Sequence, residues 1–144
     1  MAALQIILPA LLFFEALIFP TKGSPYELKP AERTIVERAV MAEAGAESFL
    51  GQVAVAQAIL DGALRNDFNV VYSIQKYQVA VSRQKPTQSV KQAVSAVFDY
   101  GVRISRQPVD LWYATWSKSN WHESQQFVFE IGAHRFFWMN RGFR

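Results

Sequence analysis

Residues 34–60, TIVERAVMAEAGAESFLGQVAVAQAIL, decide the fold, because two apolar runs flank a short acidic segment there. Apolar residues recur at helical spacing before Gly45, and Pro30 suits the first turn of the helix that they predict. A second helix is expected over residues 49–65. Its buried face would include Val53, Ala56, Ile59 and Leu60. The stretch therefore predicts two consecutive helices joined by a tight turn at residues 45–48.

The rest of the chain predicts one more helix and a small β portion. Residues 66–73 are typical of a short turn, residues 74–84 favour no element, and a third helix is expected from Pro86 towards Gly101. The segments 111–116, 126–132 and 134–138 are rich in aromatic and β-favouring residues, with Gly132 near a hairpin turn. We therefore expect an α+β fold that is mainly α, with a small C-terminal sheet.

The composition is that of one globular domain. The 144 residues are 51% hydrophobic and 19% charged, which excludes a disordered chain. The net charge of +3 is a mild basic bias, but no run of Lys and Arg forms a nucleic-acid-binding stripe, so no nucleic-acid partner is expected. The chain has no Cys, which excludes disulfides, thiolate metal sites and Cys nucleophiles.

Residues 2–19, AALQIILPALLFFEALIF, form an apolar stretch about as long as a membrane-spanning helix needs to be. We interpret residues 1–29 as an export signal or an N-terminal membrane anchor plus linker, and residues 30–144 as the functional domain. A buried N-terminal helix is the alternative. Export would place the protein in the cell envelope, in the periplasm or cell wall, with membrane attachment through residues 2–19 if that segment is not cleaved.

Glu43 is the most informative position. Val36, Val40 and Glu43 lie at i, i+4 and i+7, so the carboxylate continues the apolar stripe of the first helix. Partial desolvation there would favour the protonated carboxyl, and cleavage of a glycosidic bond requires a carboxyl that can give a proton to the leaving oxygen. The alternative is a Glu at a helix C-terminus that turns into solvent.

The stretch 34–60, together with the closing IGAHRFF of residues 131–137, resembles the SleB/CwlJ-type cell-wall hydrolase family. This resemblance implies a lysozyme-like, lytic-transglycosylase-like domain that cleaves the MurNAc–GlcNAc backbone of peptidoglycan. It implies Glu43 as the catalytic acid and base. Glu47 would be a neighbour that tunes it or, as the alternative, the acid itself. The Asn-Arg pair of the family is replaced here by Asp61 and Gly62.

The sequence favours a mechanism with one carboxylate. Other acids are available outside the first motif, but none stands in a context that marks it as a partner: Asp61, Asp99, Asp110, Glu123 and Glu130. A glycoside hydrolase needs two carboxyl groups at a defined separation. A lytic transglycosylase needs one, because the acetamido group of the substrate can stabilise the cationic centre and its own 6-hydroxyl can attack.

Aromatic residues and histidines supply the remaining candidates. Trp112, Trp116 and Trp121 are expected in the core, whereas Tyr113 is equally consistent with the core and with stacking on a sugar. His134 is expected to order the hairpin or to form a hydrogen bond near the acid. Neither His122 nor His134 has metal-ligand spacing, so no metal and no cofactor are expected.

The function predicted from the sequence is an exported peptidoglycan glycosidase. Two alternatives remain. One is a catalytically weak or inactive peptidoglycan-binding envelope protein, and the other is a membrane-anchored interaction protein.

Overall fold

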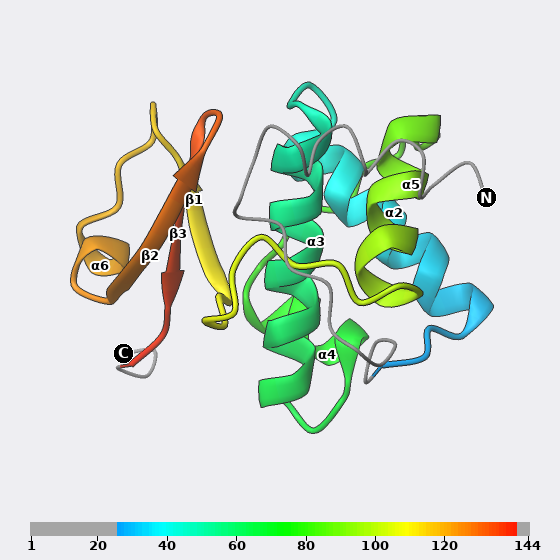
Figure 1. Ribbon diagram of the computed structural model, residues 1–144, viewed down its shortest axis with the longest axis horizontal. Helices are drawn as coiled ribbons and strands as arrows, with labels where there is room; N and C mark the ends of the chain where they lie inside the picture. Colours follow the sequence, from blue (N-terminus) through cyan, green and yellow to red (C-terminus); the bar gives the residue numbers. More distant parts are fainter. Residues whose placement is uncertain (1–25, 141–144) are drawn as a thin grey trace.

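Two consecutive helices form the centre of the molecule, as predicted. The computed structural model describes residues 26–140, in which α2 spans Pro30–Ala44 and α3 spans Phe49–Arg65. Ser48 caps α3, since its side chain accepts a hydrogen bond from the backbone N–H of Gly51. Every residue of α3 from Leu50 to Ala63 is buried, and α3 lies between the sheet and the other large helices (Figure 1).

Two further helices complete the helical part: α4, Val70–Lys76, and α5, Gln88–Phe98. The prediction of a turn over residues 66–73 is wrong for its second half. Asn69 caps a seven-residue helix by accepting a hydrogen bond from the backbone N–H of Tyr72 at 2.9 Å. A helix of two turns carries too little periodicity to be recognised in a sequence. The predicted third helix is confirmed as α5, capped by Thr87.

The C-terminal part is a three-stranded antiparallel sheet with the order β1-β3-β2. Its strands are β1, Leu111–Ala114, β2, Gln126–Ile131, and β3, His134–Trp138. The predicted hairpin is confirmed: Ile131 pairs with His134, and Gly132 occupies the turn with φ +56°. The first strand is shorter than the predicted 111–116 segment, and a four-residue helix that was not predicted, α6, Asn120–Glu123, precedes β2.

The sheet packs on the helices through one of its faces. Phe136 is completely buried in the main core, with Trp112, Phe129 and Ile131 packed at its edge. Burial of a side chain of this size contributes about 1.5–3 kcal/mol. The opposite face carries a second cluster of Leu111, Tyr113 and Phe137, and α6 lies on that side of the sheet (Figure 1). The expected mainly α, α+β architecture is confirmed.

The folded part begins before Pro30. Tyr26 and Leu28, within the predicted linker, are buried, and the Tyr26 ring meets Phe98 edge-on. Residues 2–19, on which the export or anchor prediction depends, lie outside the described residues. Within residues 26–140, no helix is long and apolar enough to cross a membrane.

Candidate functional site

Glu43 lies in the last turn of α2, where both oxygens of its carboxyl group are held by donors from other elements. Oε1 accepts a hydrogen bond from the backbone N–H of Ala80 at 3.1 Å, and Oε2 accepts one from the indole Nε1 of Trp112 at 3.2 Å. Ala80 belongs to the loop after α4, and Trp112 belongs to β1. The carboxyl group is therefore fixed at the point where the helical part meets the sheet.

Two pockets share Glu43 as a wall. One has a volume of about 210 Å³ and is lined also by Tyr77, Asp110, Trp112 and His122; we call it the Tyr77 pocket. The other has a volume of about 460 Å³ and is lined also by Glu47, Gln84, Trp116 and His134; we call it the Trp116 pocket. Glu43 is thus the residue that the two pockets share. A third pocket of about 570 Å³ lies behind the hairpin turn and is not lined by Glu43.

Glu47 is bound to the hairpin turn. Its Oε1 accepts a hydrogen bond from the backbone N–H of Ala133 at 3.2 Å, and a Cβ added to Gly132 would lie 2.4 Å from its Oε2. The Nδ1 of His134 lies 3.2 Å from Oε1, which is ion-pair distance, although the angle is not that of a hydrogen bond. Glu47 thus fastens the turn between β2 and β3 to the start of α3, and lines only one of the two pockets that Glu43 joins.

His134 is the first residue of β3, next to the hairpin turn. It is buried, and it lies at ion-pair distance from the carboxylate of Glu47. Its ring also lies beside those of Trp116 and Phe136, with centroids 6.4 and 6.2 Å away.

Tyr113 is on the other face of the sheet. Only 8% of it is exposed, and its ring stacks on Phe137 with the centroids 5.6 Å apart. Its hydroxyl donates a hydrogen bond to Glu123, which raises the pKa of Tyr113 and lowers the pKa of Glu123. Of the two interpretations of Tyr113, the structure supports the core position, because the ring lines neither pocket of Glu43.

The most important residue that the sequence did not indicate is Trp112. It was expected in the core, and one face of its ring does stack near Phe136, with centroids 6.4 Å apart. Its indole N–H, however, is the donor that reaches Glu43. Alternation along β1 was the available signal, because neighbouring residues of a strand point to opposite faces. Leu111 and Tyr113 share one face, so Trp112 faces the helices.

Asp110 also lines the Tyr77 pocket, yet its carboxyl group is already engaged. Oδ1 accepts the backbone N–H of Met139 at 2.8 Å, and Oδ2 accepts the hydroxyl of Tyr77 at 2.8 Å and lies 3.0 Å from Nη1 of Arg65. Burial raises the pKa of Asp110, against the opposing effect of these donors. Three groups of the protein therefore bind the carboxyl group of Asp110, whereas two donors bind that of Glu43.

The expectation of a core position is wrong for Trp116. The residue follows the end of β1, and 77% of it is exposed. His122, in contrast, is half-buried on the wall of the Tyr77 pocket, where its Nδ1 lies 2.6 Å from the hydroxyl oxygen of Ser119. Burial lowers the pKa of His122, so the neutral imidazole is favoured. Among residues 26–140, no three His, Asp or Glu side chains come together as a metal site.

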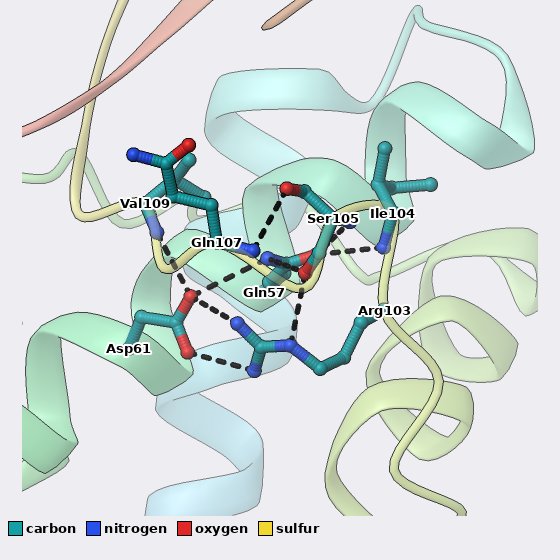
Figure 2. A network of polar contacts seen from close by, with 7 residues as sticks. All are labelled: Gln57, Asp61, Arg103, Ile104, Ser105, Gln107 and Val109. Carbon is teal, nitrogen blue, oxygen red and sulfur yellow. Dashed lines mark hydrogen bonds and ion pairs between the residues drawn. The ribbon is translucent and has the colours of Figure 1, made fainter. Parts of the chain in front are cut away.

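Asp61, which replaces an Asn of the resembling family, fastens the segment that leads into β1. Its two oxygens accept hydrogen bonds from the guanidinium of Arg103 at 2.8 and 2.7 Å, and Oδ2 also accepts the backbone N–H of Val109 at 3.0 Å (Figure 2). Gln57, one turn earlier on α3, accepts the backbone N–H of Ile104 at 2.7 Å. These contacts hold the segment that leads into β1 against α3.

A helical core, a small antiparallel sheet beside it and a carboxylate at the end of the first helix define a lysozyme-like domain. The solved structures that match this chain have the fold of the SleB catalytic domain. One is the catalytic domain of the SleB protein from Bacillus cereus, which matches with a TM-score of 0.57 and 21% sequence identity. The match covers 79% of this chain and 94% of the SleB domain. Another is the catalytic domain of the germination-specific lytic transglycosylase SleB from Bacillus anthracis, with the same TM-score and identity. That match covers 78% of this chain and 98% of the other domain. No family model and no curated protein matches the chain.

Proposed function

We propose that this protein degrades peptidoglycan by cleaving the MurNAc–GlcNAc backbone, with Glu43 as the catalytic acid and base. The observation that carries the proposal is the place of Glu43, whose carboxyl group is held by two donors and which lines two pockets. An enzyme that cuts inside a polymer has to bind sugars on both sides of the scissile bond. The fold shared with a domain known as a lytic transglycosylase supports the same conclusion.

The proposed reaction uses one carboxyl group twice. Protonated Glu43 gives its proton to the glycosidic oxygen as the bond from that oxygen to C1 of MurNAc breaks. The acetamido group of the substrate stabilises the positive charge at C1. The 6-hydroxyl oxygen then bonds to C1, and its proton returns to Glu43, which leaves a 1,6-anhydro sugar and restores the acid.

The neighbouring carboxyl groups favour this mechanism over hydrolysis. Hydrolysis with two carboxyl groups needs the second one free to attack the sugar or to activate water. Asp110 is engaged by Tyr77, Arg65 and Met139, and Glu47 is engaged by the hairpin turn. Glu43 is thus the carboxyl group that both pockets offer to a substrate.

The remaining part of the proposal concerns location. We propose that residues 1–29 direct export to the cell envelope or anchor the protein there, and that residues 30–144 carry the activity. Fractionation of cells that express the full chain tests this, since deletion of residues 2–19 should keep the protein in the cytoplasm.

One observation favours a second candidate, a peptidoglycan-binding envelope protein with little or no activity. Both Glu43 oxygens already accept N–H hydrogen bonds, and one of these has to be given up before the carboxyl group can pass a proton to a sugar oxygen. In that case the two pockets would still bind glycan strands, but no bond would be cleaved.

The decisive experiment is a digest of purified sacculi, analysed by mass spectrometry. The wild-type protein should release fragments that end in 1,6-anhydroMurNAc, and Glu43→Gln should release none while it unfolds at the wild-type temperature. Glu37→Gln, on the same helix but lining neither pocket, is the matched control and should keep full activity. Fragments with a reducing MurNAc would show hydrolysis instead. Sedimentation with sacculi without any release of fragments would favour the binding protein.

A further inference from the structure

Trp116 presents an exposed indole on a fixed backbone. The backbone N–H of Thr115 donates to the carbonyl of Ala133 at 2.7 Å, and the N–H of Ser117 donates to the carbonyl of Ala114 at 2.7 Å. The turn that carries Trp116 is therefore tied to the β2–β3 hairpin on one side and to β1 on the other. A rigid backbone under a large exposed ring costs little conformational entropy on binding, which is a property of good contact residues.

The position of Trp116 distinguishes it from other exposed apolar residues, which are common on protein surfaces. It lines the same pocket as Glu43, together with Glu47, Gln84 and His134. Its ring centroid lies 6.4 Å from that of His134 with the planes inclined by 59°, so the imidazole does not stack on it. The indole therefore keeps a face available beside the candidate acid.

The composition of the Trp116 pocket matches the two kinds of surface that a pyranose ring has. One face of such a ring carries axial C–H groups and packs on an aromatic surface, whereas the edges carry hydroxyl and acetamido groups that form hydrogen bonds. The pocket offers the indole for the first and the side chain of Gln84 for the second. Its volume of about 460 Å³ is within the range of small-molecule pockets.

The Tyr77 pocket, which Glu43 also lines, is smaller, and its rings differ from Trp116 in having polar groups that are already bound. The Tyr77 pocket is about 210 Å³, and the Tyr77 hydroxyl is committed to Asp110. The indole of Trp112, which lines the Tyr77 pocket, has its N–H bound to Glu43 and its ring beside Phe136. The two pockets thus differ in volume and in exposure, because the larger one carries the 77% exposed ring of Trp116, whereas Trp112 in the smaller one packs beside Phe136.

From these observations we infer that Trp116 is the stacking surface for a sugar ring on one side of the bond next to Glu43, and that the Trp116 pocket is a sugar subsite. The inference rests on the proposed function in that its ligand is the GlcNAc–MurNAc backbone. It adds a specificity-determining residue, and predicts that the sugar on this side contributes more to binding than the sugar on the other side.

The test is a binding and kinetic comparison on the full chain. The ligand is a purified tetrasaccharide of alternating GlcNAc and MurNAc, titrated by calorimetry into Glu43→Gln to prevent turnover. Adding Trp116→Ala should weaken binding about tenfold or more, because truncation of a buried Trp contact typically has an effect of that size. Trp116→Tyr should restore most of the affinity, since it keeps an aromatic face.

A matched control separates the subsite from a general loss of aromatic surface. Tyr72→Ala removes another exposed ring, 51% accessible, that lines neither pocket of Glu43 and should leave the affinity unchanged. In the active protein, Trp116→Ala should raise KM about tenfold on sacculi at an unchanged unfolding temperature. A change below twofold in both affinity and KM would overturn the inference.

The outcomes keep the two proposals apart. If the wild-type protein releases anhydro fragments while Trp116→Ala changes nothing, the subsite is wrong and the proposed function stands. If no fragments are released but the tetrasaccharide binds and Trp116→Ala abolishes binding, the subsite stands and the enzymatic proposal falls. If the tetrasaccharide does not bind at all, the subsite is wrong whatever the activity.

Discussion

Replacement of Trp112 by Phe tests whether the hydrogen bond to Glu43 positions the candidate acid. The change removes the indole N–H that donates to Oε2 at 3.2 Å and keeps an aromatic ring beside Phe136. A hydrogen bond contributes about 0.5–1.5 kcal/mol between neutral groups and about 1.5–3 kcal/mol where one partner is charged. About 1.5 kcal/mol, where these two ranges meet, corresponds to roughly tenfold in rate.

The expected result is a decrease of about tenfold in kcat with KM within a factor of two, measured by release of soluble fragments from labelled sacculi. KM should hold because Trp112 orients the acid, whereas the exposed binding surface is that of Trp116. Trp121→Phe is the matched control, since Trp121 packs on the opposite face of the sheet and the same loss of an indole there should leave kcat unchanged. Equal activity of Trp112→Phe and the wild type would refute the positioning role, as would a loss in KM alone.

Three further changes test the scaffold. Gly132→Ala should lower the stability by about 1–3 kcal/mol, because it places a side chain at φ +56° and 2.4 Å from Oε2 of Glu47; chemical denaturation would show this, and unchanged stability would contradict the close contact. Arg103→Met should lower the free energy of unfolding by about 3 kcal/mol, because it leaves the buried carboxylate of Asp61 without its charged partner. An unfolding midpoint equal to that of the wild type would show that the Val109 and Gln57 donors alone satisfy that carboxylate. Because burial lowers the pKa of His122, its contribution to stability is present above the unfolded value of about 6.5 and is lost as the pH falls through and below it. The unfolding temperature of His122→Gln should therefore fall less than that of the wild type between pH 7.5 and 5.5. Parallel curves of unfolding temperature against pH would contradict this.

The elements with strong local patterns were predictable from the sequence. The helices α2 and α3 follow from apolar spacing with Pro30 and Ser48 at their starts, and the hairpin follows from two β-rich segments around Gly132. Glu43 could be singled out for the same reason, since its place on the apolar stripe is a local property of α2.

The contacts that build the site were not predictable, because their partners are far apart in the chain. The donors to Glu43 are 37 and 69 residues away, and a pattern within one strand cannot show which side chain a Trp will reach. The exposure of Trp116 depends on β1 ending at Ala114, which the aromatic run LWYATW conceals. Likewise, the resemblance left two roles open for Glu47, and its contacts with the hairpin turn could be seen only once β2 and β3 were placed.

The segment between α5 and β1 has little regular secondary structure, yet several of its amides are bound inside the protein, two of them by side chains of α3 in buried hydrogen bonds. The N–H groups of Ile104 and Val109 donate to side chains of α3, Gln57 and Asp61, and both amide bonds are buried (Figure 2). Solvent protons can reach such amides only when the acceptor moves away. In hydrogen exchange this stretch should therefore be protected together with α3, although neighbouring residues without such bonds exchange quickly. An opening of this segment would then also disturb the central helix.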